Sequence, residues 1–204
     1  MFTIDTLDVV VIANRHRRAL IVPHLSAVPH TISYTDDYEL PANFTPSVVG
    51  MVQPACHTGV YRCFRGHQDA MRLATKDYVL LFEDDAVPEN LNWTQFVEAA
   101  LPLLNTFEMV SLHGRNYPRA QYQIYQQVDD KHSFLHIPNR QPGTVCVHGA
   151  LAYLLRRDAI EKMCGCEYNG MPIDILLVSV LNFCMLEPSP FIHDRSEGSL
   201  LDVL

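Results

Sequence analysis

The strongest constraint on the fold is an unbroken apolar run that ends in three carboxylates. Residues 78–82 (YVLLF) are rich in strand formers, and Glu83, Asp84 and Asp85 follow at once. A continuous run of this kind suits a strand that is covered on both faces, as in the centre of a parallel sheet. Pro88 then stops further strand pairing. The sequence therefore predicts an α/β fold around a buried central strand.

The position of these acids also predicts a ligand site. Carboxylates at the carboxyl end of a buried strand lie where open α/β sheets bind their ligands. Three adjacent negative charges repel one another unless a cation lies between them. Clustered oxygen ligands suit a hard divalent ion that also holds substrate phosphates. The alternative is an ordinary solvated acidic turn after a core strand.

Length and charge limit the domain count and the partners. The chain has 204 residues, of which 48% are hydrophobic and 19% are charged, as in an ordinary soluble domain with a sizeable core. We expect one domain over residues 1–204, with a nucleotide-binding half at about 1–88 and an acceptor half at about 89–204. The net charge of −8 argues against nucleic acid as a partner, because phosphate binding needs clustered Lys and Arg.

The chain carries no sequence signal for a membrane or for export. The longest apolar runs, such as residues 175–181, are too short to span a bilayer, and the N-terminus lacks the pattern of a secretory signal. We therefore expect a cytoplasmic protein whose six cysteines are reduced. Cys164 and Cys166 flank one glycine, but no second pair completes a metal site, so a loop at a helix end is expected there.

The first third of the chain has the pattern of a nucleotide-binding unit. Residues 7–13 (LDVVVIA) and 31–35 (TISYT) read as strands, with a short helix between them at 19–25. The cationic cluster at residues 14–18 can face a nucleotide, or it can be a solvated helix start. Asp36, at the end of the second strand, can accept hydrogen bonds from ribose hydroxyls, or it can belong to a plain turn.

The remaining elements follow from hydrophobic periodicity. Residues 60–74 are predicted to form a helix, in which His67 is expected to pack on the apolar side rather than bind a ligand. A strand at 144–147 and a weak hairpin over 122–137 are also expected. Pro172 marks the start of a later helix and places Asp174 in its first turn.

Four short stretches resemble the GT-A nucleotide-sugar glycosyltransferases, and family 25 of the glycosyltransferases in particular. They are residues 63–67 (CFRGH), 79–85 (VLLFEDD, a DXD-like motif), 149–154 (GALAYL) and 172–174 (PID). Each stretch alone is weak, but all four occur in the family's order. The resemblance implies a GT-A fold, in which a Rossmann-like half and an acceptor half share a mixed, mostly parallel central sheet flanked by helices.

The resemblance also implies roles for particular residues. Glu83 and Asp85 match the outer acids of the metal motif and would hold Mn²⁺ or Mg²⁺ against a diphosphate, while Asp84 would contact the ribose or the donor sugar. His193 matches a late histidine that often serves as a further metal ligand; the alternative is a surface histidine. The chain departs from the family pattern in its first acid, which is Glu rather than Asp, and in Gly66, which replaces a serine.

The nucleotide is expected to contact the end of the first strand. Residues 12–15 match the family's opening segment loosely, so Ala13, Asn14 and Arg15 are predicted to lie beside the nucleotide with Asp36. Arg15 or Arg65 could supply positive charge to the leaving diphosphate.

The function that follows is a metal-dependent hexosyltransferase. It would move a sugar from a nucleoside-diphosphate sugar, with a UDP-sugar favoured, to a hydroxyl of a glycan, a lipid-linked sugar or a protein. Asp174 is the candidate base for an inverting displacement, although an acid in this position can also simply stabilise a helix N-terminus. The alternatives are a nucleotidyltransferase and a non-catalytic module that binds nucleotide sugars.

Overall fold

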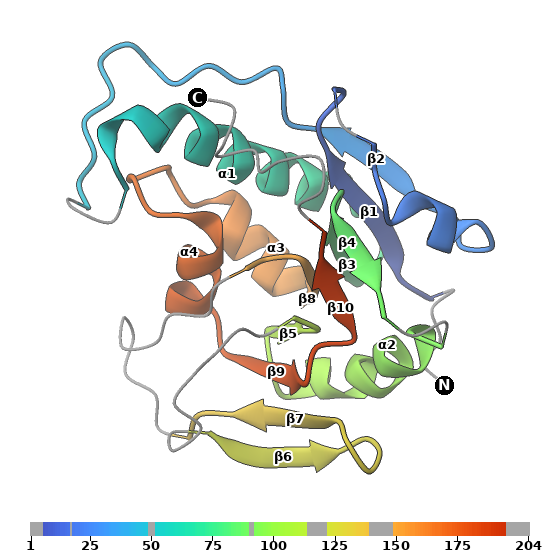
Figure 1. Cartoon of the computed structure of the whole chain (residues 1–204). Coiled ribbons are helices and arrows are strands. Elements are labelled where there is room, and N and C mark those ends of the chain that lie inside the picture. Colours follow the sequence, from blue (N-terminus) through green and yellow to red (C-terminus); the bar gives the residue numbers. More distant parts are fainter. Residues whose placement is uncertain are drawn as a thin grey trace.

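The computed structural model describes residues 6–16, 18–48, 52–89, 92–113, 122–138 and 149–194, which form an eight-stranded sheet with helices on both faces and a small two-stranded ribbon (Figure 1). The strands are β1 (Asp8–Ala13), β2 (Thr31–Tyr34), β3 (Tyr78–Glu83), β4 (Ala86–Pro88), β5 (Met109–Ser111), β6 (Gln123–Gln127), β7 (Ser133–His136), β8 (Ala152–Arg156), β9 (Phe183–Glu187) and β10 (Phe191–His193). The α-helices are α1 (His57–Arg72), α2 (Thr94–Ala100), α3 (Arg157–Cys164) and α4 (Ile173–Val180), and the 3₁₀ helices are η2 (Val22–Leu25), η3 (Pro54–Cys56) and η4 (Leu101–Asn105).

The large sheet has the strand order β2-β1-β3-β8-β5-β9-β7-β6. β1 is parallel to both β2 and β3, and β5 is parallel to β9. β8 is antiparallel to its two neighbours, and β7 is antiparallel to β6 and β9. The predicted fold class, an α/β fold with a mixed central sheet flanked by helices, is confirmed.

Alternate residues of the central strands face two separate cores. Val9 and Val11 of β1 pack with Leu80 and Phe82 of β3 in the core that includes residues of α2 and η4. Their neighbours along the strands face the core that includes residues of α1, α3 and α4. This two-sided burial explains why β1 and β3 read as continuous apolar runs rather than as alternating ones.

Most of the predicted elements occur within one or two residues of their expected bounds. The segment expected as a helix at 19–25 is the 3₁₀ helix η2, and Pro102 coincides with the change from α2 to η4. The hairpin expected in 122–137 is β6 and β7. The strand expected at 144–147 lies outside the described residues.

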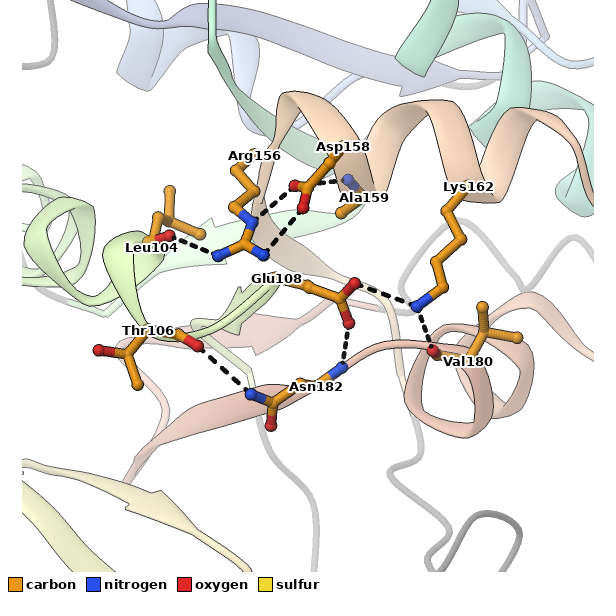
Figure 2. A network of polar contacts seen from close by, with 9 residues as sticks. All are labelled: Leu104, Thr106, Glu108, Arg156, Asp158, Ala159, Lys162, Val180 and Asn182. Atoms are coloured by element: carbon orange, nitrogen blue, oxygen red, sulfur yellow. Dashed lines mark hydrogen bonds and ion pairs between the residues drawn. The ribbon is translucent and has the colours of Figure 1, made fainter.

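A polar network ties elements together at the amino end of β3 (Figure 2). Arg156, which pairs in register with Tyr78 of β3, forms two hydrogen bonds with Asp158, of 2.6 and 2.8 Å. Glu108 accepts from Lys162 at 3.0 Å and from the backbone N–H of Asn182 at 2.6 Å. These contacts connect β8, α3 and the residues that precede β5 and β9.

Two further observations concern the helices and the cysteines. No helix in the described ranges is long and apolar enough to cross a membrane. The cysteines at positions 56, 63, 164, 166 and 184 are free thiols.

Candidate active site

The carboxyl ends of β1, β2 and β3 lie at one edge of the sheet because the three strands are parallel. Ile12 is in register with Glu83, and Ala13 is in register with Tyr34. The residues that follow these strands therefore converge in space although they are up to 70 positions apart in sequence. Ala13 itself is buried at the end of β1.

Asp85 and His193 meet beside the end of β3. Nε2 of His193 and Oδ2 of Asp85 are 2.5 Å apart, and Asp85 is only 5% exposed. The small ribbon makes this contact, because β10 pairs with β4 in a register that places His193 opposite Ala86, and the N–H of Asp194 donates to the carbonyl of Asp85. Ligand atoms of Glu83, Asp85 and His193 lie within 4.8 Å of one another.

Two buried side chains position Glu83 through a chain of hydrogen bonds that runs from Tyr153 through His67. His67 of α1 is fully buried, with its Nε2 at 3.2 Å from Oε1 of Glu83 and its Nδ1 at 2.6 Å from the Tyr153 hydroxyl. A carboxylate can only accept, so Nε2 carries the proton and Nδ1 accepts from the Tyr153 O–H. Burial, followed by the charge of Glu83, raises the pKa of Tyr153 well above its ordinary value, so the phenol stays protonated as this chain of bonds requires.

The close approach of α1 to the strands depends on Gly66. A Cβ at this position would overlap the methyl group of Thr35 and lie 3.1 Å from the Thr35 Cβ. Thr35 is 1% exposed and cannot move aside. The absence of a side chain at Gly66 therefore lets α1 pack against the end of β2 and brings His67 to Glu83.

Cys63 lies one turn before His67 on α1, and several carboxylates of the candidate site act on it. Burial raises the pKa of the Cys63 thiol well above its ordinary value, and four nearby carboxylates add to the rise. In falling order of effect these are Glu83, Asp174, Asp85 and Asp84. A group of Cys63, His67 and Glu83 also has ligand atoms within 4.8 Å of one another. Carboxylate oxygens suit a hard divalent cation such as Mg²⁺ better than a thiol does.

Asp84 anchors the segment that follows β1. Its side chain accepts from the backbone N–H of Asn14 at 3.0 Å, and its carbonyl accepts from the N–H of Leu20 at 2.6 Å. Asp84 is 3% exposed. The middle acid of the triplet thus fixes the position of the segment that was predicted to contact the nucleotide.

Arg15 bridges the ends of β1 and β2. Its N–H donates to Asp36 at 2.7 Å, and its guanidinium contacts Asp37 at 2.6 Å and lies 4.7 Å from the centroid of the Tyr34 ring. Hydrogen bonding to Arg15 lowers the pKa of Asp37. The predicted nucleotide contacts Asn14, Arg15 and Asp36 are therefore brought together at the edge of the sheet.

Asp174 lies in the first turn of α4, and its charge acts on Cys63 as do those of Glu83 and Asp85. Its Oδ2 accepts from the N–H of Gly149 at 2.9 Å, and its Oδ1 accepts from the N–H of Ile175 at 2.9 Å. Gly149 has φ of 104°, a conformation that favours glycine, and a Cβ at this position would lie 3.0 Å from Cδ2 of His113. Both roles considered for Asp174, a base and an acid at a helix N-terminus, are compatible with these contacts.

Arg65 is the one predicted site residue that the structure does not bring to the acids. It is two positions from both Cys63 and His67, so it points to the opposite side of α1. Its guanidinium lies 5.4 Å from the centroid of the Tyr38 ring. Arg15 is therefore the arginine that lies with the other predicted nucleotide contacts.

The donor set at the strand end fits a divalent cation. Two carboxylates and one imidazole converge without a change of backbone, and Asp85 is nearly buried, so a cation there would be partly shielded from water. Carboxylate oxygens suit Mg²⁺ and Mn²⁺, and the imidazole nitrogen moves the preference toward a transition ion. Such a cation would offset the repulsion between the two carboxylates.

The contact of His67 with Glu83, and that of Tyr153 with His67, were not predicted from the sequence. His67 was expected to be a packed helix residue, which its burial bears out, but the same side chain also orients an acid of the candidate site. The sequence does contain a signal for this contact. His67 lies on the apolar stripe of α1, and a buried histidine needs hydrogen-bond partners.

Comparison with known proteins gave distant structural similarity only. No protein-family model and no curated protein matches the chain. Among solved structures it is similar to A197 from STIV, with a TM-score of 0.45 and 11% identity over 90% of this chain and 83% of that one. It is also similar to a glycosyltransferase involved in glycosylation of the major capsid of PBCV-1 (TM-score 0.40, 10% identity, 76% of this chain and 63% of that one) and to HddC from Yersinia pseudotuberculosis (TM-score 0.41, 14% identity, 88% and 89%).

Proposed function

We propose that this protein is a metal-dependent glycosyltransferase that moves a hexose from a nucleoside-diphosphate sugar, with a UDP-sugar favoured, to a hydroxyl group of a glycan, a lipid-linked sugar or a protein. The observation that carries the proposal is the meeting of Glu83, Asp85 and His193 at the end of β3. The ends of β1 and β2, with Asn14, Arg15 and Asp36, lie at the same edge.

Glu83, Asp85 and His193 would hold Mn²⁺ or Mg²⁺, whose chemistry is to neutralise the negative charge that develops on the leaving diphosphate. The hydrogen bonds from Tyr153 through His67 keep Glu83 in position for this role. Outer contacts of this kind fix ligand orientation in metal sites.

The segment after β1 would bind the nucleotide. Asp84 holds this segment in place through Asn14 and Leu20, and Asp36 is available to the ribose at the end of β2. Arg15 has a guanidinium that is 47% exposed and lies between β1 and β2, where it would add positive charge near the diphosphate.

Asp174 would take the proton of the acceptor hydroxyl. As the acceptor oxygen forms its bond to the anomeric carbon, the bond from that carbon to the diphosphate oxygen breaks, and the hydroxyl proton passes to the Asp174 carboxylate. A base on the side opposite the leaving group gives inversion at the anomeric carbon. The hydrogen bonds from Gly149 and Ile175 hold this carboxylate in a fixed orientation.

The segment after β1, residues 14–18, gives less support to the nucleotidyltransferase alternative. Such enzymes hold a triphosphate with a glycine-rich, basic loop, and residues 14–18 contain no glycine. A module that binds nucleotide sugars without turnover shares the same site and differs only in the absence of transfer.

The proposal is tested by thermal unfolding of the protein with a panel of nucleotide sugars, with and without Mn²⁺. A donor that binds only the folded state at about a hundred times its Kd should raise the melting temperature by roughly 5–10 °C. We expect this shift only when donor and Mn²⁺ are both present. Release of the nucleoside diphosphate, measured in the same samples, separates an enzyme from a binding module.

Asp85→Asn is the matched control for this experiment. The variant keeps the size and hydrogen-bonding capacity of the side chain but removes one negative charge from the metal site, so it should lose the Mn²⁺-dependent shift. An equal shift in the variant and the parent protein would show that the cation binds elsewhere.

A further inference from the structure

A cavity lies beside α1, on the side of the helix that faces away from Glu83 and Asp85. It has a volume of about 430 Å³, within the range of small-molecule sites. Three segments form it: the outward face of α1, the loop that contains Pro41 and Phe44, and the residues that end α3 and follow it. The lining residues are Pro41, Phe44, Tyr61, Phe64, Arg65, Gln68, Arg72, Cys164, Gly165, Cys166, Glu167 and Tyr168.

Aromatic rings form much of the cavity wall. Phe44 and Tyr168 are stacked with their centroids 4.9 Å apart, and Tyr61 packs edge-on against Tyr168 at 5.2 Å. Phe64 contacts Tyr168 at 5.3 Å and is 1% exposed. The rings support one another, so the apolar wall is in place before any ligand arrives.

The loop after α3 is fixed against α1 by Gln68. This side chain is 1% exposed, and its amide donates to the carbonyls of Met163 at 2.9 Å and Cys166 at 2.8 Å. Burial raises the pKa of Tyr168 to about 12, and its hydroxyl is 3.1 Å from Nδ1 of His57. The side chains of Gln68 and Tyr168 are therefore fixed in position, and both are uncharged.

Arg65 lies over the Tyr38 ring and, within the described residues, forms no ion pair with a carboxylate. Arg72 forms an ion pair with Asp69 and also donates to the Cys164 carbonyl at 3.4 Å. By contrast, Nε of Arg65 is buried and has no hydrogen-bond partner among the residues that the structure describes. A buried donor of this kind costs free energy until an acceptor reaches it, which points to an anionic group on a ligand.

We propose that this cavity binds a sugar ring that carries a carboxylate, such as a uronic acid residue. The C–H face of a pyranose packs on an aromatic ring, whose face carries negative charge density. The Tyr61 hydroxyl and Glu167 can bond to sugar hydroxyls, and Arg65 would pair with the carboxylate through its planar fork. The cavity is lined by the Arg65 guanidinium and also by the carboxylate of Glu167, a balance that matches a monoanion better than a phosphate dianion.

This site is separate from the proposed donor site. Arg65 and Tyr61 are on the side of α1 that faces away from His67. Of the described residues that line the cavity, none is Glu83, Asp84 or Asp85. The site would hold part of an acidic glycan away from the point of transfer. It would exist whether or not the protein transfers sugars.

The test is titration of the ¹⁵N-labelled protein with glucuronate, followed by amide chemical shifts. We expect saturable shifts in residues 61–72 and 164–168 and little change in residues 13–15 and 83–85. Glucose should bind about tenfold more weakly because it lacks the charged hydrogen bond, and acetate should bind more weakly still because it lacks the ring. Equal binding of acetate and glucuronate, or shifts confined to the strand ends, would overturn the proposal.

Arg65→Met and Arg15→Met form a matched pair of variants. Arg65→Met keeps the aliphatic stem and should weaken glucuronate binding about tenfold or more, whereas Arg15→Met should leave it unchanged. Nucleotide-sugar binding with Mn²⁺, measured on the same samples, reports on the proposed function separately. Glucuronate binding without any nucleotide-sugar binding would uphold this cavity and refute the transferase. Parallel loss of both ligands in Arg65→Met would refute the separate site.

Discussion

At the end of the sheet drawn in Figure 2, the carboxylates of Glu108 and Asp158 lie against basic side chains, Lys162 and Arg156 respectively. At the opposite end, Glu83 and Asp85 lie against histidines, and their oxygens approach one another. The two ends use the same acidic residue types. The comparison teaches that the charges of one end are compensated by basic side chains, whereas the carboxylates of the other end lie close together, as the proposed cation site requires.

The strongest test of this difference between the two ends replaces two acids that lie in the first turns of helices at opposite ends of the sheet. They are Asp174 of α4 and Asp158 of α3. Asp174→Asn should reduce transfer by about 10²–10⁴-fold, because loss of a general base has effects of this size. The Mn²⁺-dependent thermal shift with the donor should persist. The measurement is turnover together with that shift.

Asp158→Asn is the control for the first prediction. It removes a helix N-terminal acid of the same kind, next to Arg156, so it should change stability slightly and leave turnover unchanged. If Asp174→Asn transfers sugar at the parental rate, Asp174 is a helix acid and not the base.

A second variant tests whether the approach of α1 builds the strand-end site. Gly66→Ala places a methyl group against Thr35 and should lower the free energy of unfolding by about 1–3 kcal/mol, as overpacking does. It should also weaken the Mn²⁺-dependent shift, because His67 is the next residue and contacts Glu83. Chemical denaturation measures the first effect and thermal unfolding with ligands the second.

Thr35→Ser provides the rescue for this variant. The substitution removes the methyl group that the new side chain at position 66 would meet, and it keeps the hydroxyl, which donates to the Ala13 carbonyl at 3.4 Å. The double variant should recover most of the stability that Gly66→Ala loses. No recovery would mean that the glycine is needed for a reason other than the space beside Thr35.

The smallest effect is expected at the compensated end of the sheet. Glu108→Gln weakens the contact with Lys162 and should lower the free energy of unfolding by about 1 kcal/mol, since the pair is partly exposed to solvent. Glu161→Gln, at an exposed side chain of α3, should have no measurable effect. A loss of Mn²⁺-dependent binding in Glu108→Gln, with folding intact, would contradict the division of roles between the two ends.

Local patterns in the sequence were sufficient to predict that the residues after β1, β2 and β3 lie together, whereas His193 was proposed only from the family resemblance. Continuous apolar runs located β1 and β3, and the residues directly after them had to converge once the strands were parallel. The placement of Asn14, Arg15 and Asp36 at one edge follows from this rule alone. The metal role of Glu83, Asp85 and His193 stays a prediction that the geometry makes specific.

The aromatic cavity could not be predicted in the same way. Its wall depends on a contact between Phe44 and Tyr168, which are far apart in sequence and lie in or beside loops. No periodic pattern determines which loops meet. Arg65 illustrates the consequence. From the sequence it was a candidate to add positive charge beside the diphosphate, but because it is two residues from His67 it lies on the other side of α1.

The ribbon of β4 and β10 has a consequence for biosynthesis. His193 reaches Asp85 only because β10 is laid beside β4, and more than a hundred residues separate the two strands along the chain. On the ribosome, β1 to β3 emerge with both carboxylates long before the imidazole has been made. The nascent chain therefore cannot hold a cation with all three groups, and the proposed cation site is complete only after β10 has docked.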